Sequence, residues 1–456
     1  MLRQTSFSPI VVAASFALVF ASLLTAADTS NAPVSFRRDI APILQAKCVT
    51  CHNAEKSKGG YRLHTFAELM KPGDSKELPV VARSTTKSKL HQLLVSKDSD
   101  DRMPQKDDPL PAAQVGLIAR WIEQGATFDD PEPNAPLSSL APPQTHPAAP
   151  EKYLRPVPLL ALGFTPDGTA LIAGGYHEIT MWNVTNGALL RRVGNLPQQI
   201  HSLALSPSSN LLAVCGGTAG RYGEVLLLNP DSGSILRSLA TASDVFLCLA
   251  FSPDGRQLLA GGADNSIRVF DTASGRELRR VEQHADWVMS LAFASDGKHF
   301  ASASRDKTAR LFSTASAELE ETYDGHGQPV FAVSFSRNGK RVLSGARDRE
   351  IHAWSTNDAK KVFELGGFGG DVLRLLTHED QLFSVAADRI VRQHRIAEKG
   401  GELLRAFPAS RDSVYSLAFH AATGRLASGG HDATVRIHDI ESGKLLVEFI
   451  AAPGWR

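Results

Sequence analysis

The pattern of apolar and polar residues repeats itself along the C-terminal two thirds of the chain. Residues 247–255 (LCLAFSPDG) form an alternating apolar segment that ends in an Asp-Gly turn, and residues 289–297 and 331–339 carry the same pattern. The glycines that close these segments, at positions 255, 297 and 339, are 42 residues apart. Other copies begin near Leu160, His201, Leu373 and Tyr415. We therefore predict seven copies of one structural unit within residues 159–450.

Each copy has the pattern of four short strands separated by tight turns. In the copy that starts at Leu247, a small-residue strand at 258–262 follows the first turn, and a third strand follows the turn at Asp264. Four strands in about 40–45 residues is the period of a WD40 blade. The array resembles WD40 repeats, and this resemblance implies an all-β, seven-bladed propeller.

An aspartate recurs at one turn of the unit. The five equivalent residues are Asp264, Asp306, Asp348, Asp388 and Asp432. His284 and His326 each precede such an aspartate by 22 residues, which is the Gly-His position of a WD40 repeat. Five equivalent carboxylates in five blades cannot meet at one substrate. We therefore expect them to bind turn amides and these histidines, and not to catalyse a reaction.

Residues 28–130 have helical periodicity at both ends. Ile40, Ile43 and Leu44 mark one apolar face of a helix predicted over 40–47, with Asp39 as its cap. A second helix is predicted over Pro111 to Gln124, and Gly125 is its stop signal. Its apolar stripe consists of Val115, Leu117, Ile118, Trp121 and Ile122. These helices predict a small all-α domain with Trp121 in its core.

Two further segments flank these units. Residues 1–27 combine Arg3, an apolar run over 10–24 and a small-residue ending, which is typical of a secretory signal peptide. An uncleaved membrane anchor is the alternative, because the apolar segment is about as long as a ~20-residue span. Either way, we expect the rest of the chain to be exported, to the periplasm or the outer face of the cytoplasmic membrane. Residues 131–158 hold nine prolines and are predicted to form an extended, semi-rigid linker.

The composition narrows the choice of function. The chain has 456 residues, a formal net charge of +1 and 21% charged residues, and nothing in this balance favours nucleic-acid binding. Four cysteines are too few for a disulfide scaffold. Cys215 and Cys248 fall within strand patterns, and we interpret them as buried small apolar residues. A disulfide between them is the alternative.

The other two cysteines lie in the most specific motif of the chain, Cys48-Val49-Thr50-Cys51-His52. C-x-x-C-H is the attachment signature of a c-type haem, in which two thiols form thioethers with one porphyrin and the histidine binds the iron. A zinc site needs four ligands, and the next cysteine is more than 160 residues away. A thioredoxin-like pair needs a βαβ context that is not seen here. We predict one haem c, covalently bound to Cys48 and Cys51, with His52 as the proximal iron ligand.

The distal iron ligand is predicted by elimination among the methionines. Two of the four methionines that follow the signal segment lie in predicted blades, and Met70 ends a short helix predicted over 66–70. Met103 lies in a loop just before the last helix and is followed by a proline, so it is the predicted distal ligand. Ligation by His64 or His91, or an open site, are the alternatives.

The sequence around the haem motif resembles the planctomycete-type cytochrome c domain. The similarity rests on residues 36–44 (FRRDIAPIL), the haem motif, residues 58–63 (KGGYRL), residues 102–104 (RMP) and residues 117–122 (LIARWI). It covers about residues 36–130, and it implies a covalent haem with His52 and Met103 as axial ligands. The domain is often fused to other modules in that family. We therefore expect a multidomain chain: a small all-α cytochrome c-like domain at 28–130, then a seven-bladed WD40 propeller at 159–450.

Two functions are compatible with this architecture. The first is an exported electron carrier with one haem, whose propeller serves as a docking platform for a redox partner protein. The alternative is a haem-based redox or ligand sensor, or an adaptor, whose propeller binds a partner protein. An enzyme with its active site in the propeller has the least support, because residues 159–450 show no metal-ligand cluster, nucleophile–base pair or second cofactor motif.

One register of the repeat offers a candidate partner surface. The residue just before the core of each first strand is expected near the mouth of the central channel. These residues are Leu160, His201, Leu247, Met289, Phe331, Leu373 and Tyr415. A largely apolar ring of this kind often marks a binding surface, and packing inside the inner strands is the alternative. We single out His201, Met289, Phe331 and Tyr415 as candidate contacts.

Overall fold

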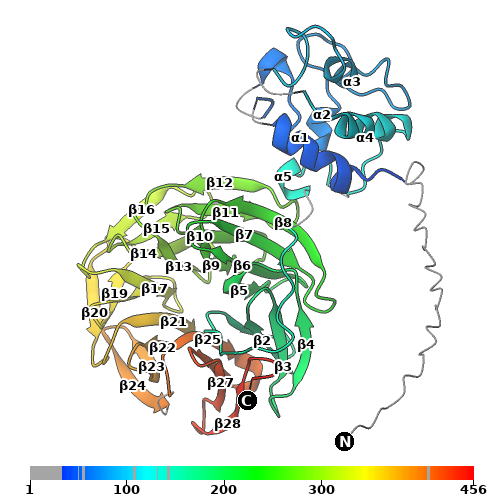
Figure 1. The fold of residues 1–456 in the computed structure, drawn as a ribbon. Helices are drawn as coiled ribbons and strands as arrows, with labels where there is room; N and C mark the ends of the chain where they lie inside the picture. The colour runs from blue at the N-terminus through cyan, green and yellow to red at the C-terminus, as the bar shows by residue number, and fades with distance from the viewer. Residues whose placement is uncertain are drawn as a thin grey trace, which may run out of the picture.

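The computed structural model describes residues 33–49, 51–53, 57–105, 109–130, 132–140, 144–407 and 411–455. The predicted signal peptide at 1–27 lies outside these residues. The described chain forms a small helical domain and a large ring of strands (Figure 1). Within the described ranges, no helix is long and apolar enough to cross a membrane.

Seven antiparallel sheets, each of four strands, form the ring. Blades 1 to 3 consist of β1 (Leu162–Phe164), β2 (Ala170–Gly174), β3 (Ile179–Asn183), β4 (Leu189–Val193); β5 (Gln199–Leu205), β6 (Leu212–Thr218), β7 (Tyr222–Leu228), β8 (Ile235–Ala242); and β9 (Phe246–Phe251), β10 (Gln257–Gly262), β11 (Ile267–Asp271), β12 (Glu277–Val281). Blades 4 and 5 consist of β13 (Val288–Phe293), β14 (His299–Ser304), β15 (Ala309–Ser313), β16 (Leu319–Tyr323); and β17 (Val330–Phe335), β18 (Arg341–Ala346), β19 (Ile351–Ser355), β20 (Lys361–Leu365). Blades 6 and 7 consist of β21 (Val372–His378), β22 (Gln381–Ala386), β23 (Val391–Ala397), β24 (Gly400–Phe407); and β25 (Val414–His420), β26 (Arg425–Gly430), β27 (Thr434–Asp439), β28 (Leu445–Ile450), with a short 3-10 turn, η4 (Ala421–Thr423), between its first two strands.

The seven predicted repeats are therefore confirmed as seven blades. Within each blade the strands pair in chain order, and the first strand lies at the centre of the ring (Figure 1). Neighbouring first strands pack against one another, and β1 packs against β25, which closes the ring. Buried apolar side chains between the sheets form the core, for example Phe246, Phe270 and Trp354.

The repeated aspartates have the structural role predicted for them. His284 Nδ1 lies 2.8 Å from Asp306 Oδ2, and His326 Nδ1 lies 2.6 Å from Asp348 Oδ2. Asp306 also accepts a hydrogen bond from the backbone N–H of Thr308 in its own turn. Burial is the largest single influence and opposes ionisation of Asp306, but the hydrogen bonds from His284, Thr308 and the Ala285 N–H, with the charge of His284, together outweigh it and hold the pKa of the carboxyl below its usual range.

The helical domain begins earlier than the sequence predicts. A π-helical turn, η2 (Phe36–Ile40), runs directly into α1 (Ala41–Lys47). Ser35, and not Asp39, caps this run: its side chain accepts a hydrogen bond from the Arg38 N–H. The Asp39 carboxylate in turn accepts a hydrogen bond from the Ser35 N–H. Each side chain thus binds a backbone N–H at the start of the helix that has no partner within the helix.

The other helices are η3 (Lys58–Gly60), α2 (Phe66–Leu69), α3 (Lys89–Leu94), α4 (Ala112–Glu123) and α5 (Leu137–Leu140). The prediction for 111–124 is confirmed by α4, and Gly125 follows it with a φ of 109°, where a side chain would be strained. Trp121 is fully buried, with its ring centroid 5.2 Å from that of Phe36, and its indole N–H donates to the Thr127 carbonyl at 2.9 Å. Trp121 is thus a core residue, as predicted.

The Pro-rich segment differs from the extended linker that we predicted. Pro136 forms an isolated β-bridge with Thr65, and α5 follows it directly. Leu137 and Leu140 are fully buried in the core of the helical domain. A proline at the start of a helix removes no hydrogen bond within the helix, so a short helix can form inside a proline-rich segment. The density of prolines therefore placed the end of the helical domain too early in the chain.

The helical domain rests on the outer strand of blade 2. α5 packs against β8 (Figure 1). The Asp130 carboxylate, only 2% exposed, lies 3.9 Å from Arg37 of η2 and 3.6 Å from Arg237 of β8. Arg37 also donates to the Leu236 carbonyl on the same strand. These contacts fix one placement of the haem-motif domain against the propeller.

Residues 144–158 are attached to the propeller along their length. His146 Nε2 lies 2.8 Å from Glu224 Oε2 of β7, and both side chains are buried. Tyr153 donates through its backbone to the Pro453 carbonyl and through its hydroxyl to Glu178 Oε1. Tyr153 therefore ties the N-terminal approach, blade 1 and the C-terminal segment together where the ring closes.

Candidate haem site

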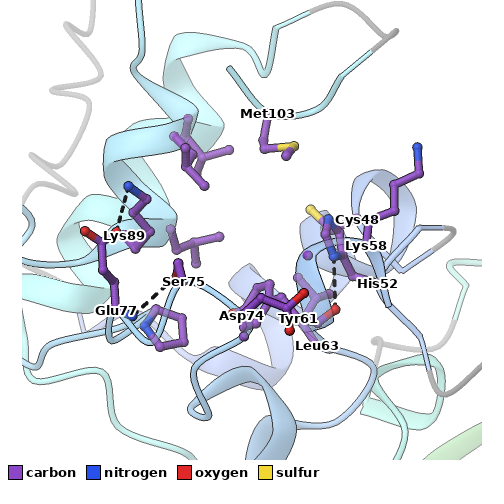
Figure 2. A pocket seen from close by; sticks show the side chains of 16 residues that line it. Cys48, His52, Lys58, Tyr61, Leu63, Asp74, Ser75, Glu77, Lys89 and Met103 are labelled. Atoms are coloured by element: carbon purple, nitrogen blue, oxygen red, sulfur yellow. Dashed lines mark hydrogen bonds and ion pairs between the residues drawn. The ribbon is translucent and has the colours of Figure 1, made fainter. Parts of the chain in front are cut away.

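A cavity in the helical domain gathers the residues of the haem motif and the predicted distal ligand (Figure 2). It contains about 870 Å³ of space free of protein atoms, part of it open to solvent. The lining residues are Cys48, His52, Lys58, Gly59, Tyr61, Leu63, Gly73, Asp74, Ser75, Glu77, Pro79, Lys89, Leu90, Leu93, Leu94 and Met103.

The end of α1 presents the haem motif to this cavity. The Cys48 N–H donates to the Leu44 carbonyl at 2.9 Å, and the His52 N–H donates to the Cys48 carbonyl at 3.1 Å. This turn places Cys48 and His52 on the cavity wall. Cys51 is exposed and is not among the lining residues, so it lies at the solvent side of the motif.

The His52 imidazole is oriented by a backbone carbonyl. Its Nδ1 lies 3.1 Å from the Tyr61 oxygen. Because a carbonyl oxygen only accepts, Nδ1 carries the proton and Nε2 keeps its lone pair for a metal. Tyr61 is in turn held by a hydrogen bond from its hydroxyl to the Leu69 carbonyl at 2.9 Å. Sequence reasoning missed Tyr61, because a main-chain acceptor leaves no residue-type signal.

Met103 approaches the cavity from the opposite wall. Its thioether faces the space in front of Cys48 and His52 (Figure 2). The loop is attached to α3, since the Met103 N–H donates to the Leu93 carbonyl at 3.0 Å. The alternative ligands His64 and His91 are not among the residues that line the cavity.

The helix α3 builds an apolar side of the cavity and was not predicted. Leu90, Leu93 and Leu94 all line the cavity from it. Their spacing of three and four residues is that of one helical face, and this signal was present in the sequence. Gly73 on another side lies so close to Gly59 that a Cβ at Gly73 would sit 2.5 Å from the Gly59 carbonyl oxygen.

Charged groups are confined to the rim. Lys89 Nζ lies 2.7 Å from Glu77 Oε2, and Lys58 and Asp74 are exposed. Inside the cavity, burial and the neighbouring Cys51 raise the pKa of the Cys48 thiol to about 12. Burial likewise raises the pKa of the Tyr61 hydroxyl well above its usual value. The interior of the cavity thus disfavours charge.

These residues fit the haem that the motif implies. An apolar cavity suits a porphyrin, a thiol lies on its wall, and one imidazole nitrogen and one thioether are free to bind iron from opposite sides. The donor set of one imidazole and one thioether is that of cytochromes c. Residues that would hold the haem are Cys48, Cys51, His52 and Met103.

A second cluster of metal-ligand residue types lies in the propeller, where the sequence suggested none. His326, Asp348 and His352 come within reach of one another because His352 on β19 stacks on His326, with ring centroids 3.9 Å apart. His326 is hydrogen-bonded to Asp348 and Ser344. His352 is hydrogen-bonded to Tyr323 and Glu350. With all four ring nitrogens engaged, this cluster is part of the blade core.

Only some of the residues predicted to form the channel ring line a common cavity. His201 and Met289 line a cavity at the centre of the propeller, together with Leu160 and Leu247. Phe331, Leu373 and Tyr415 are partly buried and are not among the residues that line it.

Cys215 and Cys248 are buried free thiols, as expected for small apolar residues of the core.

Comparison with known families identifies both units. Residues 48–107 match planctomycete cytochrome C, and residues 233–271, 275–313, 317–355 and 401–439 match the WD domain, G-beta repeat. The chain therefore combines a planctomycete cytochrome c domain with WD40 repeats that form a seven-bladed propeller.

One similar solved structure is a crystal structure of the computationally designed Ika8 protein. It is 24% identical, has a TM-score of 0.52, and covers 65% of this chain and 90% of its own. At this identity the likeness concerns the fold alone. The comparison with curated proteins gave no match.

Proposed function

We propose that this protein is an exported electron carrier with one covalent haem c, and that its propeller is a docking platform for a redox partner protein. Cys48 and Cys51 would form the two thioethers, and His52 and Met103 would bind the iron. The observation that carries the proposal is the pairing of a correctly oriented His52 with Met103 across one apolar cavity.

The chain's own residues would hold the site in a state suited to reversible electron transfer. A bound haem supplies an iron that cycles between ferric and ferrous states. Tyr61 fixes the tautomer of His52 through its carbonyl, and the leucines of α3 give the cavity an apolar wall. A thioether ligand in an apolar site favours the ferrous form, so we expect a raised reduction potential.

The first experiment tests the covalent haem. Acid–acetone extraction of the purified, exported protein is expected to leave the haem on the chain, with a sharp α-band after reduction. The double variant Cys48→Ala/Cys51→Ala, produced in the same export system, is expected to lose it. Haem that is fully extracted from the parent protein would refute covalent attachment.

The second experiment tests the distal ligand. Met103→Ala is expected to abolish the weak long-wavelength band of a Met-ligated ferric haem and to open the ferrous iron to carbon monoxide. Met70→Ala is the matched control, because Met70 packs against the core of the same domain and is not among the cavity-lining residues. A Met103→Ala variant with unchanged spectra would refute Met103 as ligand.

The same titration separates the carrier from a ligand sensor. A carrier keeps both axial positions filled, so the parent protein is expected not to bind carbon monoxide. Carbon monoxide binding by the parent would favour the sensor. Among the described residues, the helical domain packs on β8 of blade 2, and the platform role is proposed for the other blades.

A further inference from the structure

One residue breaks the repeat at the centre of the propeller. The position directly after the channel-ring residue is small in six blades and is arginine in blade 6. The seven residues are Ala161, Ser202, Cys248, Ser290, Ala332, Arg374 and Ser416. The strand register shows that they are equivalent: Ser290 pairs with Ala303, Ala332 with Gly345, Arg374 with Val385 and Ser416 with Gly429, each just past the same bulge.

The small residues at this position reach the neighbouring first strand. Ser416 Oγ donates to the Leu159 carbonyl at 2.7 Å, and Ser290 Oγ accepts from the Val333 N–H at 3.3 Å. Arginine is too long for that gap between adjacent strands. Arg374 instead lines the central cavity, together with His201 of blade 2 and Cys248 of blade 3.

The charge of Arg374 acts across this cavity. Burial and then the Arg374 charge lower the pKa of His201 to about 4. Burial also lowers the pKa of the Arg374 guanidinium, which Cys248 only partly offsets. His201, Cys248 and Arg374 are the titratable side chains among the described residues that line the cavity.

No carboxylate balances this cation. Among the described residues, Arg374 has no ion pair, and its one hydrogen bond to the protein runs from Nη1 to the Leu373 carbonyl at 3.0 Å. Two other buried arginines of the propeller are paired: Arg268 with Asp264, and Arg392 with Asp388. A partly buried guanidinium that lacks a counter-charge is costly, unless an anion from outside supplies one.

We propose that the central cavity of the propeller binds one small oxyanion through Arg374. The planar guanidinium presents two parallel N–H donors, which match the oxygen spacing of a carboxylate or a phosphate. Ser202 and Ser290 add hydroxyl groups to the cavity wall. The site lies next to His201 and Met289 at the candidate partner surface, and it is independent of the haem.

The test uses the full-length haem-loaded protein. Sodium phosphate or sodium acetate is added at constant ionic strength, balanced with sodium chloride, and binding is followed by calorimetry and by the Tm of the propeller. We expect either phosphate or acetate to bind, which identifies the oxyanion class. Arg374→Ser is expected to weaken that binding by about tenfold or more, as loss of a charge-assisted bidentate contact does.

The Arg374→Ser variant is well suited to this test. Serine occupies the same position in three other blades, so the fold is expected to tolerate it. The control is Arg395→Ser, which removes the same charge from an exposed position of the same blade, near Asp380. Arg395→Ser is expected to keep the parent's anion affinity.

The stability of the variants gives a second readout. In chloride alone, Arg374→Ser is expected to have a Tm equal to or above that of the parent, because an unpaired charge is removed from the cavity. Phosphate or acetate should then raise the Tm of the parent and not that of the variant. Two results would overturn the proposal: no binding of either anion by the parent, or a Tm of Arg374→Ser that is lower by the same amount with and without anion.

Discussion

The helical domain and the propeller use their polar residues in opposite ways. In the helical domain each functional group occurs once, so that His52 and Met103 meet at a single cavity. In the propeller, polar pairs recur from blade to blade, as His284–Asp306 and His326–Asp348 do. Recurrence at one turn in five blades indicates a structural role, because the turns of separate blades cannot meet at one substrate.

This comparison also shows where to look for function inside a repeat. A residue that departs from the repeat, and that the fold leaves without a partner, is the informative one. Arg374 fulfils both conditions, whereas the aspartates, which look more like catalytic residues, fulfil neither. We therefore predict that the chemistry of this protein is confined to its unique positions.

The largest effect is expected from removing the haem attachment. Cys48→Ala/Cys51→Ala leaves the apolar cavity of a small domain without its occupant, so the helical domain should lose its own unfolding transition. The propeller should unfold as before. Differential scanning calorimetry with Cys215→Ala as the control measures both transitions. A helical domain that is equally stable without haem would contradict this part of the account.

The next effect concerns a repeated pair. His326→Leu removes one hydrogen-bond partner from Asp348 and one from the buried Ser344 hydroxyl. We expect this to destabilise the propeller by about 2–4 kcal/mol without changing the haem spectrum. His431→Leu is the matched control, since His431 is about half exposed and should cost less than about 0.5 kcal/mol. Denaturant unfolding measures the two variants, and equal losses would show that the buried pair has no special role.

The sequence predicted the repeat and the haem motif because both are local patterns. Seven alternating segments, the Gly-His positions and Cys48 to His52 could be read without the fold. Tyr61 could not, because its role lies in a backbone carbonyl that reaches His52 only after the loop has folded. The helix α5 could not be predicted either, because the surrounding prolines indicate an extended segment. Nor could the role of Arg374, because its lack of a partner depends on distances across the channel.

Acid is expected to destabilise the propeller through its buried neutral histidines. Burial lowers the pKa of His201, His394 and His438 to about 4 each, from 6.5 in the unfolded chain. As the pH falls, the unfolded chain binds these protons before the folded protein does. The contribution of the three histidines to the free energy of unfolding is therefore fully present above pH 6.5 and is lost as the pH drops toward 4. Each histidine should account for on the order of 1 kcal/mol or more.

This pH dependence can be assigned to one residue. Urea unfolding of the propeller is measured at pH 7 and at pH 4.5 for the parent and for His438→Asn. The variant should lose less stability between the two values than the parent does. An unchanged difference would mean that His438 is protonated in the folded state at pH 4.5.

The smallest effect is expected at the contact between the two units. Asp130→Asn weakens the attraction to Arg37 and Arg237, and we expect a cost of about 1 kcal/mol to the docking of the helical domain. Small-angle scattering should detect a larger radius of gyration, with both unfolding transitions unchanged. Asp358→Asn, at an exposed pair with Lys360, is the control. An unchanged radius would show that α5 alone holds the domain in place.

The central claim is that one His52 nitrogen and one Met103 sulfur bind a single iron in the helical domain. X-ray absorption at the iron edge of the purified protein tests it most directly. We predict one sulfur scatterer at bonding distance together with the nitrogen shell, and loss of that sulfur in Met103→Ala. A first shell of nitrogen alone in the parent protein, as two histidine ligands would give, would contradict the account.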